Sequence, residues 1–213
     1  MANLFSMRSE YMKSGLRRAD LEDNPIKQFE LWFNQAIDAK LIEPNGMTLA
    51  TVGVNMLPSI RMVLLKSYDE DGFVFFSNYN SKKALQIEQN PLCALHFAWL
   101  GLERQVKIEG SIEKISKTAS LKYFFSRPKG SQIGAWVSHQ SKVISSRSLL
   151  EAKFEEIKAK FSKGEIPFPE FWGGYIVKPK NIEFWQGGKD RLHDRFEYVL
   201  MEDGSWDIKR LAP

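Results

Sequence analysis

The feature that most constrains this fold is a change of hydrophobic period along the chain. Short β-rich segments precede a helical middle, and others follow it. The first group contains MTLATVGV, SIRMVLLKSY, GFVFFSN, LCALHFAWL and ERQVKIEGSIEKI, and the second contains FWGGYIVKPKNIEFWQ, RLHDRFEYVL and SWDIKRLAP. Strands that cluster on either side of helices, rather than alternating with them, favour an antiparallel sheet or barrel. The sequence therefore predicts an α+β fold.

Helix signals mark the segments between and around these strands. Asn24 can cap a helix that begins at Pro25, with an apolar stripe of Ile26, Phe29, Trp32, Phe33, Ala36 and Ile37. Further helices are predicted in SKKALQIEQN, SKTASLKYFFSRP, GSQIGAWVS and SRSLLEAKFEEIKAKFSKG, the last ending at Gly164. Residues 1–24 are polar and mixed, which predicts an N-terminal arm. Residues 25–213 contain no repeat or linker and are expected to form a single domain.

Composition limits the classes of function. The 213 residues are 43% hydrophobic and 26% charged, as in globular proteins with a hydrophobic core. No apolar run reaches the roughly 20 residues that cross a bilayer, and the first residues lack the pattern of a secretory signal. Cys93 is the single cysteine, which fits a reducing compartment, so we expect a cytoplasmic protein. The net charge is +4 without a Lys/Arg block, which argues against nucleic acid as a partner.

Familiar catalytic motifs are missing from the sequence. It contains no GxGxxG turn, no phosphate loop of the GxxxxGKS or GxxxxGKT type and no GxSxG elbow. The three histidines, His96, His139 and His193, lie far apart, and none has a metal ligand at short spacing. We therefore expect no metal site, and we expect His96, in an apolar strand, to be structural.

Two stretches suggest bound anions through their cations. If Ser81 caps the helix that follows it, Lys82 and Lys83 occupy the first turn, where the helix dipole disfavours cations unless a phosphate binds there. The alternative is a pair of solvated lysines. Arg61 and Lys66 bracket an apolar strand, and the alternative there is two charges at a strand edge.

A third stretch, YFFSRPKGSQIG, combines a hydroxyl, a guanidinium and a helix start. Tyr123 and Arg127 are four residues apart on one predicted helix face, Pro128 ends that helix, and Ser131 can open the next one. Such a combination could form a phosphate cradle. The alternative is that Arg127 caps the C-terminus of its own helix.

The stretch RLHDRF carries three cationic side chains at alternate positions. In a regular strand Arg191, His193 and Arg195 would lie on one face, and Leu192 would point away from them. Like charges on one face repel each other unless something negative lies across them. With two or three anion sites and no metal or nucleophile, these signals suggest a phosphorylated cofactor and a phosphorylated substrate. Trp185 and Gln105 could then lie beside an aromatic redox ring.

Seven stretches carry a family resemblance: RMVLLK, SKKALQIEQNP, ERQVKIEG, YFFSRPKGSQIGAWVSHQS, FWGG, IEFWQGG and RLHDRFEY. In this order and spacing they resemble the pyridoxine (pyridoxamine) 5′-phosphate oxidase family, from about residue 7 to the C-terminus. The resemblance implies a homodimer of antiparallel split β-barrels of the FMN-binding type, with flanking helices and FMN at the subunit interface. The departures are Lys82, where arginine is usual, Phe76, where tyrosine is common, and Ser9 in the arm motif.

The resemblance also implies site residues. FMN contacts would come from Arg61, Met62, Val63, Leu64, Leu65, Lys66, Phe76, Ser77, Lys82, Lys83, Gln105, Gln140, Ser141, Trp185 and Arg195. The substrate phosphate would be held by Lys66, Tyr123, Arg127 and Ser131. Arg191 and His193, the catalytic pair, would lie over the pyridine ring, and Arg8 and Tyr11 would close over the substrate.

The implied reaction converts pyridoxamine or pyridoxine 5′-phosphate to pyridoxal 5′-phosphate. A hydride passes from C4′ to flavin N5, and oxygen then reoxidises the flavin and yields hydrogen peroxide. A different function in the same fold stays open: a split-barrel FMN-binding reductase acting on another substrate would share the FMN residues and lack the substrate residues. A nucleic-acid-binding module would instead be colourless and would bind with strong salt dependence.

Overall fold

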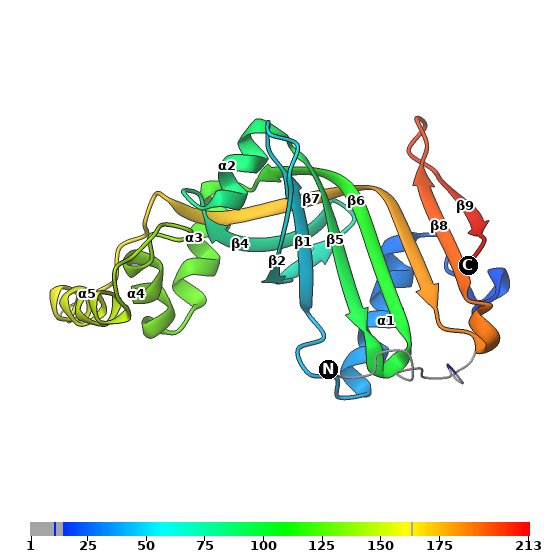
Figure 1. The fold of residues 1–213 in the computed structure, drawn as a ribbon, viewed down its shortest axis with the longest axis horizontal. Helices are drawn as coiled ribbons and strands as arrows, with labels where there is room; N and C mark the ends of the chain where they lie inside the picture. Colours follow the sequence, from blue (N-terminus) through cyan, green and yellow to red (C-terminus); the bar gives the residue numbers. More distant parts are fainter. Residues whose placement is uncertain (1–10, 12–14, 163) are drawn as a thin grey trace, which may run out of the picture. The chain divides into compact units, whose positions relative to one another are not determined.

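The computed structural model describes residue 11, residues 15–162 and residues 164–213. The strands are β1 (Gly46–Val52), β2 (Pro58–Leu64), β3 (Ser67–Asp69), β4 (Gly72–Asn78), β5 (Leu92–Trp99), β6 (Arg104–Lys114), β7 (Trp172–Gln186), β8 (Asp194–Leu200) and β9 (Trp206–Leu211). The helices are α1 (Pro25–Asp38), α2 (Lys82–Gln89), α3 (Lys117–Ser126), α4 (Lys129–Val137) and α5 (Arg147–Lys160), with 3-10 turns η2 (Arg18–Asp20), η3 (Leu100–Leu102) and η4 (Lys189–Arg191). The predicted order of strands, helical middle and strands is confirmed (Figure 1).

The strands in the described part of the chain form one sheet with the order β2-β1-β5-β6-β7-β4-β3, and β8 pairs with both β7 and β9. The pairs β4–β7, β7–β8 and β8–β9 are antiparallel. Strand β7 is long enough to pair with β4 through its first half, where Trp172 lies opposite Asn78, and with β8 through its second half, where Trp185 lies opposite Arg195. The α+β class predicted from the sequence is confirmed.

The described chain divides into two compact units. Unit 1 comprises the described residues up to Leu49 together with Ala94–Gly110 and Pro179–Pro213, and unit 2 comprises Ala50–Cys93 and Ser111–Lys178. Strands β1, β5, β6 and β7 contribute residues to both units. An arm over residues 1–24 and a single domain over residues 25–213 stay predictions.

Helix α1 packs on the sheet of unit 1 through its apolar stripe. The Asn24 side chain caps it as predicted and accepts a hydrogen bond of 2.8 Å from the Ile26 amide. The ring of Phe29 lies 5.0 Å from that of Phe97, and Trp32 meets Phe184 edge-to-face at 5.2 Å. Burial of each such side chain stabilises the fold by about 1.5–3 kcal/mol. The predicted stripe was wrong at Ile37, which is 47% exposed.

Helices α3, α4 and α5 build an apolar cluster of their own in unit 2, and α4 and α5 lie side by side (Figure 1). The buried members of this cluster are Phe124, Ile133, Ala135, Val137, Ile157, Ile166 and Trp172. Because Trp172 is the first residue of β7, the cluster joins the helices to the sheet. Helix α5 ends at Lys160, so the predicted end at Gly164 was wrong; the Phe161 amide already closes the last turn on the Ile157 carbonyl at 3.0 Å.

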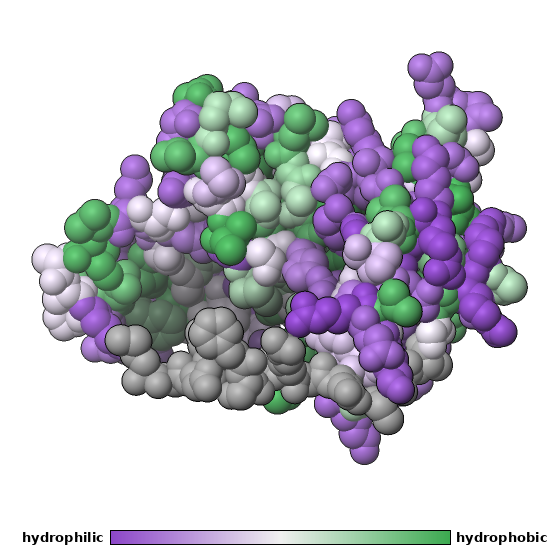
Figure 2. Space-filling model, turned by 45° about the vertical axis from the view of Figure 1, so that its right-hand side comes forward, coloured by the Kyte–Doolittle hydropathy of each residue, from purple (hydrophilic) through white to green (hydrophobic). Residues whose placement is uncertain are grey.

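Hydrophobic side chains also reach the surface, as the green areas of Figure 2 illustrate. In unit 2 they gather on β2 and the connection before it, and the exposed members are Val54, Met56, Leu57, Ile60, Met62 and Leu64. On β2 they occupy every second position, because strand side chains alternate between two faces. No helix in the described ranges is long and apolar enough to cross a membrane.

Candidate functional site

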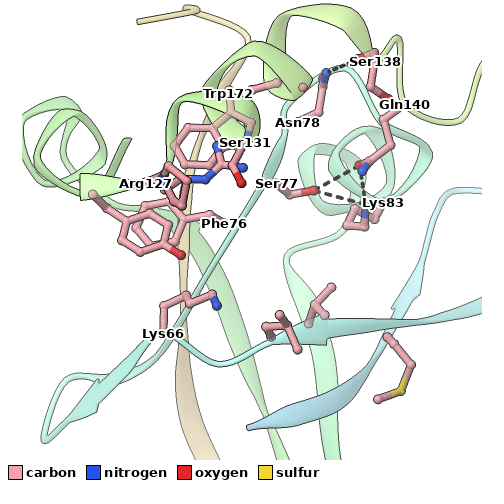
Figure 3. A pocket seen from close by; sticks show the side chains of 17 residues that line it. Lys66, Phe76, Ser77, Asn78, Lys83, Arg127, Ser131, Ser138, Gln140 and Trp172 are labelled. Carbon is pink, nitrogen blue, oxygen red and sulfur yellow. Dashed lines mark hydrogen bonds between the residues drawn. The ribbon is translucent and has the colours of Figure 1, made fainter. Parts of the chain in front are cut away.

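Unit 2 contains a pocket of about 560 Å³, a size typical of small-molecule sites (Figure 3). The sequence-predicted residues that line it are Met62, Val63, Leu64, Lys66, Phe76, Ser77, Lys83, Tyr123, Arg127, Ser131 and Gln140. Sequence reasoning missed the other lining residues, which are Asn78, Pro128, Gly134, Ala135, Ser138 and Trp172. In the close-up, Arg127, Ser131, Phe76 and Trp172 lie on one side, Ser77, Lys83 and Gln140 lie on the other, and the Lys66 amine points into the space between (Figure 3).

Lys83 is a buried cation, only 7% exposed. It lies in the first turn of α2, which Ser81 caps as predicted by accepting from the Ala84 amide. Its Nζ donates to Oε1 of Gln140 at 2.7 Å, to Oγ of Ser77 at 3.1 Å and to Oγ of Ser81 at 3.4 Å. Burial, and then the charge of Arg61, lower the pKa of Lys83 to about 8. All three partners are neutral, so an anion in the pocket would stabilise the ammonium.

The alternative of two solvated lysines is therefore wrong for Lys83, although Lys82 is exposed. Four predicted cofactor residues of unit 2 do not line this pocket. Lys82 and Ser141 line an adjacent groove of about 400 Å³ that also includes Gln140. Leu65 is 4% exposed, and Arg61 donates from Nη1 to Oγ1 of Thr51 at 2.6 Å.

Arg127 is the cation on the opposite side of the pocket. The carbon of its guanidinium lies 4.7 Å from the ring centroid of Trp172. Its Nη1 is buried and has no hydrogen-bond partner in the described ranges of the chain. Burial lowers the pKa of Arg127. A buried N–H without an acceptor is costly, so this atom points to a ligand that accepts hydrogen bonds.

The local geometry around Arg127 corrects two sequence-based expectations. Helix α3 ends at Ser126 and Arg127 has an extended backbone, because Pro128 disfavours helical conformation in the residue before it. Tyr123 and Arg127 therefore do not share a helix face. Ser131 lies within the first turn of α4, whose N-cap is Pro128, so Ser131 does not open the helix. Tyr123, Arg127 and Ser131 nevertheless all line the pocket. The Arg127 side chain lies over Trp172 rather than capping α3.

An aromatic stack forms one wall of the pocket. The ring of Phe76 lies 3.9 Å from that of Tyr123, with 23° between their planes, and 5.3 Å from that of Trp172, with 15° between them. Such parallel contacts restrict the rotation of all three rings. Phe76, at a position where the resembling family commonly has tyrosine, thus contacts both other rings, which also lie 6.2 Å from each other with 8° between their planes.

Unit 1 holds the remaining predicted residues that the structure describes. The His193 ring lies 4.6 Å from that of Trp185, and Tyr11 meets Trp185 at 5.8 Å and His193 at 5.7 Å, in both cases edge-on. The Gly188 amide donates to Nδ1 of His193 at 3.1 Å. This contact places the proton of a neutral imidazole on Nε2. Arg8 lies outside the described residues.

The strand predicted over RLHDRF begins later than expected. β8 starts at Asp194, and Lys189–Arg191 form a 3-10 turn with Arg191 at a φ of 64°. Strand alternation therefore does not apply to Arg191 and Leu192, and the single shared face predicted for Arg191, His193 and Arg195 was wrong. The turn brings the Leu192 carbonyl against Gly188, where a Cβ would approach it to 2.1 Å, so only glycine fits there.

Arg195 is paired with a carboxylate that sequence reasoning missed. Its Nε donates to Oε1 of Glu183 at 2.7 Å, and Lys107 lies 3.1 Å from the other oxygen. Burial acts to raise the pKa of Glu183, but the hydrogen bonds from Arg195 and Lys107 outweigh it, and the pKa is lowered. The alternation of NIEFWQ places Glu183 on the same face as Trp185, which was the available signal.

Gln105 is held by His96, which was expected to be structural. Nε2 of His96 lies 3.0 Å from Oε1 of Gln105, so the imidazole orients the amide. No group of three or more His, Cys, Asp or Glu side chains that could hold a metal occurs in the parts of the chain that the structure describes. The described site residues thus divide between unit 2, where most of them line the pocket, and unit 1, where Tyr11, Trp185 and His193 contact one another.

Comparison with known proteins adds the family. Residues 33–161 match the family described as pyridoxamine 5′-phosphate oxidase, and residues 172–213 match the pyridoxine 5′-phosphate oxidase C-terminal dimerisation region. The chain belongs to the pyridoxamine 5′-phosphate oxidase family. The family predicted from the seven stretches is confirmed, and so is the expectation of an enzyme of this kind.

Curated relatives within the pyridoxamine 5′-phosphate oxidase family match this chain over its full length. A protein of Aliarcobacter butzleri (strain RM4018) named pyridoxine/pyridoxamine 5′-phosphate oxidase is 69% identical over 211 residues, which is 99% of this chain and 100% of the relative. A protein of the same name from Crocosphaera subtropica is 63% identical over 213 residues, again 99% of this chain and 100% of the relative.

Solved structures agree on the fold. PhzG from Burkholderia lata 383, in complex with tetrahydrophenazine-1-carboxylic acid, has a TM-score of 0.89 at 25% identity and covers 96% of this chain and 100% of its own. An FMN-binding protein from Nostoc punctiforme, related to pyridoxamine 5′-phosphate oxidase, has a TM-score of 0.72 at 16% identity, with 91% of this chain and all of its own covered. The predicted antiparallel split barrel with flanking helices is confirmed.

Proposed function

We propose that this protein uses FMN to oxidise pyridoxamine 5′-phosphate and pyridoxine 5′-phosphate to pyridoxal 5′-phosphate, with reduction of oxygen to hydrogen peroxide. The observation that carries the proposal is a pair of cationic groups on different sides of one pocket, the buried Lys83 and the half-buried Arg127, whose Nη1 is buried. Neither makes an ion pair with a carboxylate in the described ranges. Two phosphorylated ligands that meet in this pocket would satisfy both.

The residues on the Lys83 side fit the phosphate of FMN. Lys83 forms no ion pair in the described ranges, and burial and the charge of Arg61 lower its pKa; Ser77 and Gln140 add hydrogen-bonding groups, and Arg61 adds a second charge. A helix N-terminus such as that of α2 also favours a phosphate. When bound, FMN would supply the two-electron acceptor for the hydride at C4′ and would return these electrons to oxygen.

The residues on the Arg127 side suit the phosphate of the substrate. Arg127 can donate charge-assisted hydrogen bonds from the buried Nη1, and Lys66, Tyr123 and Ser131 line the same side or the adjoining floor of the pocket. Charge-assisted contacts of this kind are typically worth about 1.5–3 kcal/mol each. They would hold the phosphate and thereby fix the position of the ring attached to it.

The unit 1 set is assigned to the reacting ring through the family resemblance. His193, held by Gly188 through Nδ1, would present Nε2 to a substituent of the pyridine ring, and Arg191 would donate to another. Arg195 would offset negative charge on the cofactor, with Gln105 and Trp185 beside it. Tyr11 packs against His193 and Trp185 and would restrict access of water to this ring.

A homodimer is part of the proposal. The match to a dimerisation region supports it, and so does the apolar stripe on β2, where Ile60 is 73% exposed and Met62 is 66% exposed. A stripe of this kind is costly in water and suits a protein interface. Met62 and Leu64 also line the pocket, so a partner subunit that covers the stripe would border the bound cofactor. A cytoplasmic location stays a prediction from the sequence.

The test is to purify the protein, record its flavin spectrum and measure peroxide and pyridoxal 5′-phosphate after addition of pyridoxamine 5′-phosphate. We expect a yellow dimer that forms both products and acts poorly on unphosphorylated pyridoxamine. A yellow protein that forms neither product would instead be a split-barrel FMN-binding reductase for another substrate. A colourless protein would contradict the assignment of the Lys83 side to FMN.

A further inference from the structure

The guanidinium of Arg127 has an unusual environment for a cation that binds phosphate. Its main chain is anchored at both ends, since its amide donates to the Phe124 carbonyl at 3.2 Å and its carbonyl accepts from Nε2 of Gln132 at 2.8 Å. Its side chain forms no ion pair in the described ranges and lies instead against an aromatic face, with 4.7 Å between Cζ and the ring centroid of Trp172. The indole is therefore a close neighbour of the guanidinium on one face.

Trp172 is itself held rigidly. It is 7% exposed, and it meets Phe124 at 5.5 Å and Phe168 at 6.3 Å, both edge-to-face. Its plane is within 15° of that of Phe76 and within 8° of that of Tyr123. Edge contacts from the core and parallel contacts along the pocket wall together leave the indole little freedom to rotate.

A planar guanidinium against an aromatic face keeps its N–H groups free at its edges. Those N–H groups can then donate two parallel hydrogen bonds to a phosphate. If a carboxylate were the partner of the guanidinium, it would occupy the same N–H groups. The buried and unpartnered Nη1 of Arg127 fits this arrangement. Trp172 also offsets part of the cost of burying the charge, because the ring face is electron-rich.

We propose that Trp172 is a positioning residue for the substrate phosphate, since its indole face orients the Arg127 guanidinium toward the pocket. The inference rests on the proposed function, in which Arg127 holds that phosphate. It extends the function to a residue that joins the helical core of unit 2 to the ligand site.

The experiment measures the affinity of the FMN-loaded protein for pyridoxal 5′-phosphate and for pyridoxal, which lacks the phosphate. Trp172→Leu removes the ring face and should weaken binding of pyridoxal 5′-phosphate about 3- to 30-fold, with little effect on pyridoxal. Trp172→Phe keeps an aromatic face and should restore most of the affinity. In steady-state kinetics the KM for pyridoxamine 5′-phosphate should rise while kcat changes less.

Phe168→Leu is the matched control, because Phe168 packs on Trp172 and Phe124 and does not line the pocket. It should lower the melting temperature and leave the preference for the phosphorylated ligand unchanged. If Trp172→Leu also lowers only the melting temperature, Trp172 is a core residue and the inference is overturned.

A double-mutant cycle decides the matter if Trp172→Leu does not fold. Trp172→Met also removes the ring face, and combining it with Arg127→Ala should abolish the effect of Trp172→Met on the affinity for pyridoxal 5′-phosphate, whereas additive effects would overturn the inference. The proposed function fails separately: in that case Arg127→Ala alone would leave the preference for the phosphorylated ligand intact.

Discussion

The carboxylate of Glu183 accepts a hydrogen bond of 2.7 Å from Nε of Arg195 and lies 3.1 Å from the amine of Lys107. Glu183 is 6% exposed, whereas the two cations are more accessible to solvent. A buried carboxylate between two cations holds both of them in place, and its own charge is stable only while they remain. The cation assigned to the flavin is thus oriented by a residue with no assigned role in the chemistry.

Glu183→Gln should destabilise the protein by about 1.5–3 kcal/mol, the usual value of hydrogen bonds to a charged group. The amide keeps the shape of the side chain and one acceptor but leaves Arg195 and Lys107 without a negative partner. Urea unfolding at neutral pH measures the effect. Glu109→Gln is the control, because Glu109 contacts the same lysine at 3.5 Å with a side chain that is 47% exposed, and it should change stability by less than about 0.5 kcal/mol. Equal effects of the two substitutions would show that burial of Glu183 does not matter.

The ion pair of Glu183 with Arg195 also predicts how the stability of the protein depends on pH. Because the pKa of Glu183 is lowered in the folded protein, its contribution is complete above the ordinary value of 4.5 and is lost as the pH falls through the lower, folded value. Wild-type protein should therefore lose more stability than Glu183→Gln as the pH is lowered below about 4.5. Parallel pH profiles of the two proteins would contradict this assignment.

Lys83 should make the affinity for FMN depend on pH in the alkaline range. Its pKa of about 8 in the ligand-free protein means that the ammonium deprotonates as the pH rises above 8, and the phosphate of FMN then loses its partner. The affinity for FMN should fall by up to about tenfold per pH unit above 8. Quenching of FMN fluorescence in titrations of the apoprotein measures the trend.

Two comparisons isolate the effect of Lys83. Lys83→Met should bind FMN weakly at all pH values and lose the dependence, and riboflavin, which has no phosphate, should show little dependence with either protein. In the ligand-free wild type, the free energy of unfolding should instead increase with pH between about pH 8 and the ordinary lysine pKa of 10.5. In that range Lys83 is still protonated in the unfolded chain but has lost its proton in the folded protein. A wild-type affinity for FMN that is constant from pH 7 to about pH 10 would exclude Lys83 as the phosphate partner.

Arg127→Ala tests the other side of the pocket. Removal of one charge-assisted contact of about 1.5–3 kcal/mol should raise the KM for pyridoxamine 5′-phosphate roughly 10- to 150-fold. Unphosphorylated pyridoxamine, already a poor substrate, should be almost unaffected. Lys129→Ala removes a nearby exposed charge that does not line the pocket and should leave both reactions unchanged. Equal losses on the two substrates after Arg127→Ala would mean that this residue is structural.

Much of the fold could be predicted from the sequence because its signals are local. The cap at Asn24 and the apolar period after it specify α1, and Ser81 specifies the start of α2 in the same way. The extended backbone of Arg127 also has a local cause in Pro128, although the four-residue spacing from Tyr123 suggested a shared helix face. Periodicity alone did not give enough weight to the proline.

The parts of the site that escaped prediction depend on tertiary contacts. The burial of Lys83 and the contact of Trp172 with Arg127 join segments far apart in the chain, and no periodicity specifies which side chain lies across from another. The positive φ of Arg191 results from a turn that closes on Gly188 rather than from a preference of arginine. Alternation places Glu183 on the face of Trp185, a signal that sequence reasoning did not use, but it could not show that Arg195 and Lys107 surround the carboxylate.

Gly188→Ala tests whether this turn holds the imidazole of His193 in a position that the proposed reaction requires. An alanine Cβ would lie 2.1 Å from the Leu192 carbonyl oxygen, so the turn must shift and the hydrogen bond from the Gly188 amide to His193 must lengthen or break. FMN content should stay near that of the wild type, while kcat/KM for pyridoxamine 5′-phosphate should fall at least about tenfold, equivalent to 1.4 kcal/mol of transition-state stabilisation.

His193→Asn should give a comparable loss, and the double variant should lose little more, because both changes affect the same group. Gly130→Ala is the matched control, since no described atom beyond its chain neighbours and its own helix backbone lies within 4 Å of its Cβ position in helix α4, and it should keep full activity with equal or slightly higher stability. Stopped-flow flavin reduction on proteins of known FMN content measures the set. Reduction at the wild-type rate in Gly188→Ala would show that the reaction does not require this placement of His193.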